Sequence, residues 1–387
     1  MKILQVVQDL RVGGAERTAI TLSNGLAARG HEVLLVAIKG AGPQKSRIED
    51  HPGLKFEILG IDRSSIVNPV AFLRDTKRLV SRLRDLMQVF QPEIVQTHFP
   101  EDSLLVDRSM KGLSAGAHLP VVHSQRFHIY RRRADLRSRL RLQLQKRALL
   151  RAARVVAVSG AVKRALVEVI GLDPDSIAVL HNGSDLTAFR ALPNKGEARA
   201  RLDLSPDSPL VMAVGRLDRP KNFPLLVRAS VEVLRRFPDA RFVLIGEGPE
   251  RDRIETEIRR LDVGGAWALL GQRSDVPECL AAADVFALSS DWEGFPVAVI
   301  EAMAAGLPVA ASDVAGVGEL VEHQRNGLLV ESGNVDQLQQ AICRLLSDAD
   351  LAARLAGAAR EHAFGCYDLD AYMERVEELF REVQSGA

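Results

Sequence analysis

Short apolar runs of four to seven residues recur along the chain, and longer segments with helical spacing of their apolar positions lie between them. Apolar runs of this length bounded by polar turns predict buried strands. In the first half we expect strands at residues 2–8, 32–37, 54–59, 94–97, 120–123, 155–158 and 177–180. In the second half we expect strands at residues 210–214, 242–245, 267–270, 285–288 and 309–312. Because helical segments alternate with these strands, the pattern favours an α/β fold built on parallel, doubly wound sheets.

The length of 387 residues predicts two domains, since a typical domain has about 100–200 residues. Hydrophobic residues make up 47% of the chain, which is enough for two cores. The segment 192–208 is rich in proline, charged and small residues, so we expect it to link the domains. The first domain then spans residues 1–190 and the second 191–366.

One stretch organises the second half of the chain, from Glu293 to Pro308. It reads as a loop that feeds a short helix, with Pro296 at the first helical position and Gly306 after the last. Glu293 then lies on the loop and Glu301 on the second turn. The first-turn amides have no intrahelical acceptor and can bind an anion; in this interpretation they include those of Phe295 and Val297. Two carboxylates around a phosphate site suit a nucleotide sugar, although two solvated glutamates on a surface helix fit the spacing equally well.

The sequence of this stretch, Glu293-Gly294-Phe295-Pro296 with Glu301 and Ala-Met-Ala-Ala-Gly after it, resembles the family 4 retaining glycosyltransferases of the GT-B fold. The resemblance implies two Rossmann-like domains that face a cleft, with a C-terminal helix, residues 367–387, that crosses back to the first domain. It also implies that Glu293 approaches the donor sugar and that Glu301 holds the ribose hydroxyls. The position of Pro296 is often glycine in that family, so the chain has one backbone donor fewer there.

The first strand leads into a glycine turn, Gly13-Gly14, and then into a helix. Strand, glycine turn and helix form the arrangement in which a phosphate reaches a helix N-terminus. The Gly-x-Gly-x-x-Gly dinucleotide fingerprint is missing, which argues against an NAD enzyme, and a lone Gly-Gly pair is just as typical of a structural turn. The longer string Gly-Gly-Ala-Glu-Arg resembles the N-terminal signature of one branch of the same glycosyltransferases. This resemblance implies that Gly13 and Gly14 lie near the donor diphosphate.

Two histidines follow expected strands of the first domain. His98 comes directly after the strand 94–97, and ligands of parallel sheets bind outside the carboxyl ends of strands. A strand-end histidine is often a hydrogen-bonded structural residue, but His98 coincides with the family's strand-end histidine, which faces the transferred sugar. His123 and Arg126 end the next strand and are weaker candidates for the acceptor site. The turn Asn182-Gly183 resembles the motif that closes the family's first domain.

Basic residues follow the first strand of the second domain. Arg216 lies on the loop after it and Lys221 at the start of the next helix, so both can contact one anion. Two cations on a loop are commonly just solvated, but the family has an arginine and a lysine here for the donor diphosphate. Gly246 and Arg273 follow the next two strands, where the resemblance implies contacts to the nucleotide.

The net charge of +1 hides an asymmetry between the two halves of the chain. Residues 1–190 carry 30 Lys and Arg against 18 Asp and Glu, while residues 191–387 carry 21 against 32. This polarity indicates an anionic partner for the first half. The segment 126–154 holds eleven basic residues and one acid, Asp135, with leucines at helical spacing. It is either a helix with a basic outer face or an interfacial helix drawn to anionic lipid. Few aromatic residues accompany it, which argues against nucleic-acid binding.

Composition excludes other classes. The three cysteines, Cys279, Cys343 and Cys366, have neither metal-type spacing nor an even number, which favours free thiols in a reducing compartment. No signal-peptide pattern and no run of about eighteen apolar residues is present, so we expect a cytoplasmic protein, peripheral on the inner membrane face at most. The sequence contains no metal-binding cluster, and we expect activity without metal or cofactor.

These observations predict a retaining, metal-independent hexosyl- or N-acetylhexosaminyltransferase. It would move a sugar from a nucleoside-diphosphate donor, UDP-linked by expectation, to a hydroxyl of a glycan or polyprenyl-diphosphate-linked acceptor in cell-surface polysaccharide assembly. His98, Glu293, Arg216 and Lys221 would carry catalysis. Two alternatives stay open at this point: a UDP-sugar epimerase of related architecture, and a two-domain protein that binds sugar without chemistry.

Overall fold

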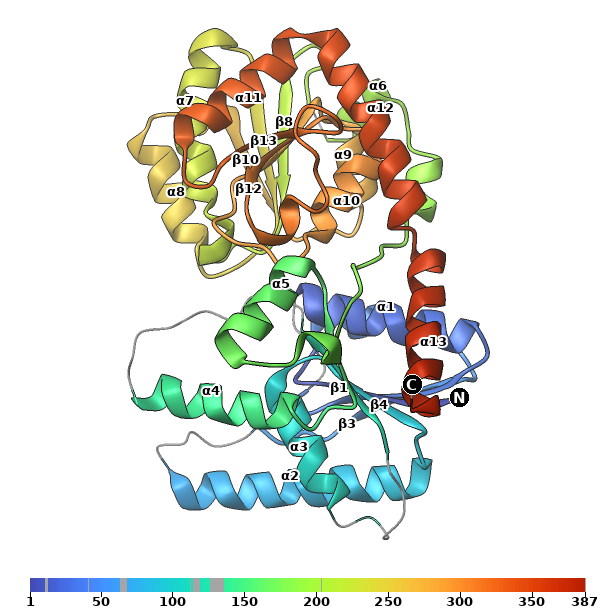
Figure 1. Ribbon diagram of the computed structural model, residues 1–387. Helices are drawn as coiled ribbons and strands as arrows, with labels where there is room; N and C mark the ends of the chain where they lie inside the picture. Colours follow the sequence, from blue (N-terminus) through green and yellow to red (C-terminus); the bar gives the residue numbers. More distant parts are fainter. Residues whose placement is uncertain are drawn as a thin grey trace. The chain divides into compact units, whose positions relative to one another are not determined.

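The computed structural model in Figure 1 describes residues 1–10, 13–40, 42–62, 68–111, 113, 119–125, 136–202 and 204–386. The chain divides into two compact units. Unit 1 comprises Met1–His181 together with Met373–Ala387, and unit 2 comprises Asn182–Tyr372. The change of unit lies after His181, nine residues before the boundary expected at residue 190.

Unit 1 is a seven-stranded parallel sheet in the order β3-β2-β1-β4-β5-β6-β7. Its strands are β1 (Lys2–Val7), β2 (Glu32–Ala37), β3 (Leu54–Ile58), β4 (Ile94–Thr97), β5 (Val121–Gln125), β6 (Arg154–Ala157) and β7 (Ile177–Val179). Its longer helices are α1 (Gly14–Ala28), α2 (Pro69–Phe90), α3 (Pro100–Met110), α4 (Leu136–Leu149) and α5 (Gly160–Ala165). Shorter turns are η1 (Pro43–Arg47), η2 (Leu166–Ile170) and η3 (Pro174–Ser176). Strands β1, β2, β4 and β5 are almost wholly buried because helices cover both faces, whereas the edge strands β3 and β7 are partly exposed.

Unit 2 is a six-stranded parallel sheet in the order β10-β9-β8-β11-β12-β13. Its strands are β8 (Leu210–Val214), β9 (Arg241–Ile245), β10 (Trp267–Gly271), β11 (Val285–Leu288), β12 (Val309–Asp313) and β13 (Leu328–Glu331). Its longer helices are α6 (Lys195–Arg201), α7 (Phe223–Arg236), α8 (Arg251–Arg260), α9 (Val276–Ala281), α10 (Val297–Ala304), α11 (Val335–Ser347) and α12 (Ala349–Cys366). Shorter turns are η4 (Thr187–Arg190), η5 (Arg219–Lys221), η6 (Gly264–Ala266) and η7 (Ala315–Val317). Strand β13 has no counterpart among the sequence expectations.

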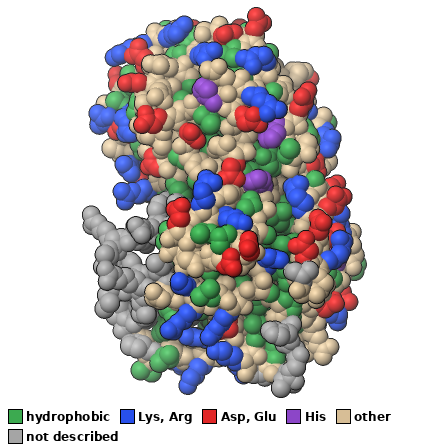
Figure 2. All heavy atoms as spheres, viewed as in Figure 1, with side chains coloured by type: hydrophobic (Ala, Val, Ile, Leu, Met, Phe, Trp, Pro, Cys, Tyr) green, Lys and Arg blue, Asp and Glu red, His purple; other side chains and the backbone are tan. Residues whose placement is uncertain are grey.

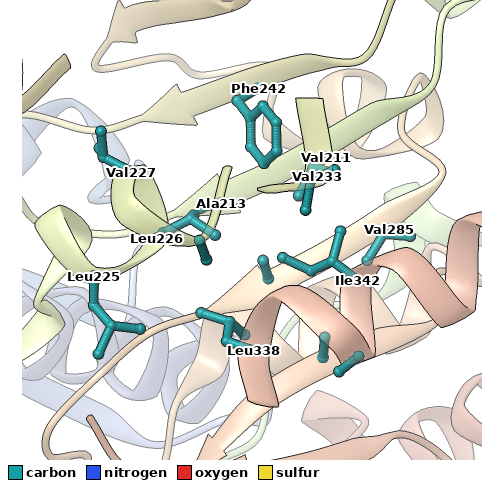
Figure 3. Packing of buried hydrophobic residues seen from close by; sticks show 14 of the residues in the cluster. Val211, Ala213, Leu225, Leu226, Val227, Val233, Phe242, Val285, Leu338 and Ile342 are labelled. Carbon is teal, nitrogen blue, oxygen red and sulfur yellow. The ribbon is translucent and has the colours of Figure 1, made fainter. Parts of the chain in front are cut away.

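The core of unit 2 lies where α7 and α11 cover the central strands (Figure 3). Leu226 and Val233 of α7 and Ile342 of α11 belong to one buried cluster with Phe242 of β9 and Val211 of β8. Helix α7 buries residues at steps of three and four, which places its apolar side chains on one face. Burial of this kind stabilises by about 25 cal/mol for each Å² of apolar surface.

The segment expected to link the domains lies within unit 2. It contains α6, whose Arg199 is buried and binds the Asp284 carboxylate, with Nη2 and Oδ2 2.5 Å apart. Arg199 Nε also donates to the Ala282 carbonyl at 3.0 Å. A charged residue buried with its partner fixes the segment on α9 and β11 rather than leaving it as a free tether.

The C-terminal helix α13 (Leu369–Ser385) returns to unit 1, as the sequence predicts. It packs on α1, where a Cβ at Gly25 would come within 2.7 Å of the Met373 side chain. Glu377 accepts from His31 Nε2 at 2.9 Å and from Arg29 Nε at 3.2 Å. Burial raises the pKa of Glu377, but the His31 and Arg29 contacts outweigh it, and the net pKa is lowered. The carboxylate therefore anchors α13 in its ionised form.

Candidate functional site

In unit 2 the strand order reverses between β8 and β11, which lie side by side at the centre of the sheet. In doubly wound sheets ligands usually bind beside the loops that leave the carboxyl ends of two such strands. The first loop carries Arg216 and Lys221, and the second carries Ser290 and Glu293. Arg216, Lys221 and Glu293, which carry the family resemblance in the sequence, therefore lie on these two neighbouring loops.

The loop after β8 is held by the turn after β9. Leu217 N donates to the Glu247 carbonyl at 3.0 Å, and Glu250 N donates to the Leu217 carbonyl at 2.9 Å. Gly246 has a φ of +142°, and a Cβ there would lie 1.9 Å from the Gly215 carbonyl oxygen. Only glycine permits both this conformation and this approach. Gly246 thus allows the close backbone contact that positions Gly215 and the following residue, Arg216.

A short ion pair joins the two loops. Lys221 Nζ lies 2.6 Å from Glu293 Oε1, and Ser290 Oγ donates to the same oxygen at 2.6 Å. The side chains of Lys221 and Glu293 are only 19% and 8% exposed. In such a partly desolvated position charge-assisted hydrogen bonds are short and strong. The pair fixes Lys221 between the two loops, where its ammonium can approach an anionic ligand.

Asp218 adds a second carboxyl to this cluster. Burial raises its pKa and the neighbouring Glu293 raises it further, while Lys221 and Arg216 act in the opposite direction, with a net rise. Its Oδ1 atom is buried and has no hydrogen-bond partner among the described residues. The Arg216 side chain is exposed. The cluster therefore combines the exposed Arg216 guanidinium, the neutral Lys221–Glu293 ion pair and the Asp218 carboxyl, whose pKa is raised.

Helix α10 begins one residue later than the sequence predicts. Pro296 is not the first helical residue but the N-cap, with extended dihedral angles of φ −79° and ψ 107°, and the helix starts at Val297. The Phe295 amide consequently precedes the cap and is not a first-turn donor; the Phe295 carbonyl accepts from Asn182 Nδ2 at 3.2 Å. The helix has eight residues, about two turns rather than three.

Two contacts hold the α10 region, one at the loop before the helix and one at its second turn. A Cβ at Gly316 would lie 1.9 Å from the Gly294 carbonyl oxygen, so the loop before α10 and the turn η7 touch through backbone alone. Glu301 is buried on the second turn of α10, as predicted, and Ser184 Oγ lies 3.5 Å from its Oε1. The helix thus carries a buried carboxylate one turn beyond its free amides.

Arg273 is tied to a neighbour. Its Nε and Nη2 atoms lie 2.8 and 2.5 Å from the two carboxylate oxygens of Asp275, just before α9. This two-point contact raises the pKa of Arg273 and lowers that of Asp275, where it outweighs the effect of burial. The predicted nucleotide-binding side chain is therefore part of a fixed neutral pair after β10.

In unit 1 the corresponding reversal of strand order lies between β1 and β4. Gly13 is the N-cap of α1 after β1, Gly14 is its first residue, and Gln44 Nε2 donates to the Gly13 carbonyl at 3.1 Å. His98 follows β4 and is completely buried. Both therefore lie at the carboxyl edge of the sheet, while Arg126 lies outside the described residues.

A chain of amides fixes His98. Its Nε2 lies 2.8 Å from Gln5 Oε1, Gln5 Nε2 donates to Gln96 Oε1 at 2.7 Å, and Gln96 Nε2 donates to Ser124 Oγ at 2.7 Å. All four residues are at most 3% exposed. An amide oxygen only accepts, so His98 donates through Nε2 to Gln5.

His123, the weaker candidate for the acceptor site, belongs to a second buried network. Its Nδ1 lies 2.8 Å from Ser103 Oγ and 3.0 Å from Thr97 Oγ1, and its Nε2 lies 3.1 Å from Gln125 Oε1. The ring is completely buried. These contacts assign His123 to the packing of β4, β5 and α3.

Four residues of these clusters are absent from the sequence predictions: Gln5, Gln96, Ser290 and Asp218. A signal for the two glutamines is present, because each is a polar residue within a strand that is otherwise apolar. Buried polar side chains require hydrogen-bond partners, so two glutamines in neighbouring strands indicate each other. No comparable signal marks Ser290 or Asp218, whose roles depend on the folding of two loops onto each other.

No helix among the described residues is long and apolar enough to cross a bilayer. Within that same part of the chain, no three His, Cys, Asp or Glu side chains gather as metal ligands would.

Two family profiles match the chain. The profile described as Glycosyltransferase Family 4 matches residues 12–188, and that described as Glycosyl transferases group 1 matches residues 194–362. The chain is 27% identical over 354 residues to the UDP-Gal:alpha-D-GlcNAc-diphosphoundecaprenol alpha-1,3-galactosyltransferase of Escherichia coli, which covers 90% of this chain and 88% of the relative. It is 35% identical over 230 residues to the D-inositol 3-phosphate glycosyltransferase of Nocardia farcinica, which covers 57% of this chain and 51% of the relative.

Solved structures share the fold. The Anabaena protein Alr3699/HepE, crystallised in complex with UDP, superposes with a TM-score of 0.81 over 99% of this chain and 100% of that one, at 23% identity. At this level of identity the likeness concerns the fold, which is that of two parallel-sheet α/β domains.

Proposed function

Because the chain belongs to the family 4 glycosyltransferases of the GT-B fold, we propose that it is a retaining enzyme that uses a UDP-linked sugar. The acceptor is a hydroxyl of a glycan or of a polyprenyl-diphosphate-linked sugar in cell-surface polysaccharide assembly. The E. coli relative is named for a UDP-linked donor and a diphosphoundecaprenol-linked acceptor, which supports both parts of the proposal.

The observation that carries the proposal is the cluster of Arg216, Lys221 and Glu293 at the reversal point of the unit 2 sheet. Departure of a nucleoside diphosphate builds up negative charge on the leaving oxygen. Cations held next to that oxygen lower the activation barrier, because the folded protein has already oriented them and they need not reorganise during the reaction. Lys221, held by Glu293, supplies such a cation, and Arg216 supplies a second.

The remaining residues orient the donor. Glu301 takes the ribose hydroxyls, the amides at the start of α10 and the Gly13-Gly14 turn face phosphate, and His98 together with Glu293 orients the sugar. Gly246 and Arg273 shape the nucleotide side. The departing phosphate itself removes the acceptor proton on the same face of the sugar, so no carboxylate nucleophile and no metal is needed.

We further propose that the protein meets its lipid-linked acceptor at the inner membrane face. The sequence predicts this contact for the segment 126–154, of which residues 126–135 lie outside the described part of the chain. The basic balance of residues 1–190 supports an anionic partner on unit 1.

The test starts with binding and then measures turnover. A thermal-shift series with UDP, UMP and uridine should stabilise the protein most with UDP, by about 2.7 kcal/mol at a hundredfold its dissociation constant. Lys221→Ala should lower the rate of sugar transfer about 10²–10³-fold, and Lys163→Ala on α5 is the matched control. Equal turnover of the Lys221 variant would remove this residue from the mechanism.

Two outcomes address the alternatives. Conversion of a UDP-sugar in the absence of any acceptor would identify an epimerase. A product whose anomeric configuration is inverted by NMR would refute retention, and loss of turnover on treatment with EDTA would refute metal independence.

A further inference from the structure

The backbone of Lys221 is bound to the loop after β11. Lys221 is the last residue of η5, and the next residue, Asn222, has a left-handed backbone with φ 43° and ψ 42° and precedes α7. The Lys221 carbonyl accepts a hydrogen bond from Ser289 Oγ at 3.0 Å. Ser289 is the first residue after β11 and is completely buried. The main chain of Lys221 is therefore held by a residue 68 positions later in the sequence.

Two more hydrogen bonds join the same two loops. Asp291 N donates to the Pro220 carbonyl at 2.9 Å, and Asn222 Nδ2 donates to Asp291 Oδ1 at 2.7 Å. Because β8 and β11 are neighbours in the sheet, the loops that follow them leave it side by side. Together with the Ser289 contact, these bonds hold the three consecutive residues from Pro220 to Asn222 against the loop after β11.

The side chain of Lys221 is held as well. A Cβ at Gly215 would lie 3.4 Å from Lys221 Cε, so the aliphatic stem runs beside this glycine. The ammonium lies 2.6 Å from Glu293 Oε1, a contact that uses one of its three N–H donors. Exposed ion pairs differ: on the face of unit 2 in the upper part of Figure 2, Lys and Arg side chains lie among Asp and Glu, where water screens them. Lys221 is thus a cation that the fold orients along its whole length.

We propose that Ser289 is a positioning residue for Lys221, an inference that rests on the proposed function. The Ser289–Lys221 contact is partly buried, and a carbonyl that loses its partner in such a place is costly. Without the Ser289 hydroxyl the Lys221 carbonyl turns toward water, and the backbone rotation displaces the ammonium. Stabilisation of a leaving diphosphate requires cations that are oriented in advance, and a displacement of about 1 Å removes much of the effect. Ser289 therefore acts through Lys221 rather than on the substrate.

The test compares the binding of UDP with that of uridine by calorimetry. UDP carries the charge that builds up as the diphosphate leaves the donor, so its affinity reports on Lys221, whereas uridine has no phosphate. We expect Ser289→Ala to weaken UDP binding about five- to tenfold and to leave uridine binding unchanged. Ser109→Ala is the matched control, because Ser109 is also completely buried and donates to a backbone carbonyl, that of Leu105 at 2.8 Å. The control should bind UDP as the native protein does.

The Lys221→Ala background separates positioning from a purely structural role. Lys221→Ala keeps its main-chain carbonyl, so Ser289→Ala should lower the urea midpoint of unfolding equally in both backgrounds. Its effect on UDP affinity should vanish in Lys221→Ala, because the ammonium that Ser289 positions has been removed. Asp291→Ala, at an exposed site, removes the acceptor of Asn222 and should weaken UDP binding about twofold, again only when Lys221 is present. If Ser289→Ala does not fold, Asp291→Ala decides by the same comparison.

Three results would overturn the inference: unchanged UDP affinity in Ser289→Ala, an equal loss of affinity for UDP and uridine, or the same loss of UDP affinity with and without Lys221. In the last two cases Ser289 supports the fold alone. Failure of the proposed function has a different signature, since the native protein would then bind UDP no better than uridine, or Lys221→Ala would bind UDP as the native protein does. Either of these results overturns the inference together with the proposed function.

Discussion

The amide chain beneath His98 allows a quantitative prediction. Gln5 lies on β1 and contacts His98 on one side and Gln96 on the other, with both distances under 3 Å and every partner buried. Gln5→Leu keeps the volume of the side chain but removes one acceptor and one donor. His98 Nε2–H and Gln96 Oε1 each lose a partner without gaining access to water.

Each buried polar atom that loses its partner costs about 1–3 kcal/mol, so the two losses sum to about 2–6 kcal/mol. The leucine recovers part of this by apolar burial. We therefore expect unit 1 to lose about 2–4 kcal/mol of its free energy of unfolding. Gln88→Leu, an exposed glutamine on α2, is the control and should change stability by less than about 0.5 kcal/mol.

The assay has to separate the two units, because a chain of two units need not unfold in one step. Both tryptophans, Trp267 and Trp292, belong to unit 2, so tryptophan fluorescence reports on unit 2 alone. Hydrogen exchange of peptides that contain β1 and β4 reports on unit 1. We expect faster exchange of these peptides in Gln5→Leu and an unchanged fluorescence midpoint in urea.

The same variant tests the state of the imidazole. Nitrogen-15 NMR of the native protein should show His98 protonated at Nε2, and Gln5→Leu should weaken this preference for Nε2. If unit 1 exchange is unaffected, or if the native ring is protonated at Nδ1, then Gln5 does not accept from His98 and the support of the imidazole by the amide chain is refuted.

Two further predictions concern unit 2. Gly246→Ala introduces a Cβ 1.9 Å from the Gly215 carbonyl oxygen at a φ of +142°. We expect this variant to lose about 2–4 kcal/mol of its free energy of unfolding, measured by fluorescence in urea, and to bind UDP more weakly. The control Gly264→Ala, whose Cβ would have its nearest neighbour outside the adjacent residues at 3.9 Å, should lose far less. The pKa of Asp218 is raised, so on acidification the folded state binds this proton before the unfolded state does. The free energy of unfolding should therefore rise as the pH falls from neutral through the folded pKa toward the ordinary value of 3.8. Asp218→Asn should remove that rise. A fluorescence midpoint with the same pH dependence in Asp218→Asn as in the native protein would contradict this assignment.

Local patterns account for most of the elements. Strands β2, β4, β8 and β11 have the bounds that the apolar runs predict. These runs are short and continuous because a parallel strand is buried on both faces, and that demand acts on each strand separately. Boundaries differ where one residue decides them: Pro296 is a cap rather than a helical residue because its dihedral angles are extended.

Sequence alone also places chemistry at strand ends, since any parallel strand delivers the residue that follows it to the same edge of the sheet. Arg216, Lys221, Glu293 and His98 are predicted in this way, with the family resemblance supplying their expected roles. The packed structure alone determines which of them meet. Lys221 and Glu293 are 72 residues apart, and their contact requires β8 and β11 to be neighbours in the sheet and the turn after β9 to hold the first loop.

The sequence by itself therefore determined the fold class, the strand positions and the residue types at the strand ends, because hydrophobic burial and turn chemistry act over a few neighbouring residues. Only the tertiary structure decided that Gln5 contacts His98, that His123 joins a buried network with Ser103 and Thr97, and that the segment 192–208 is part of unit 2. Each of these depends on partners distant in sequence, and their proximity follows from sheet order and helix packing rather than from any local signal.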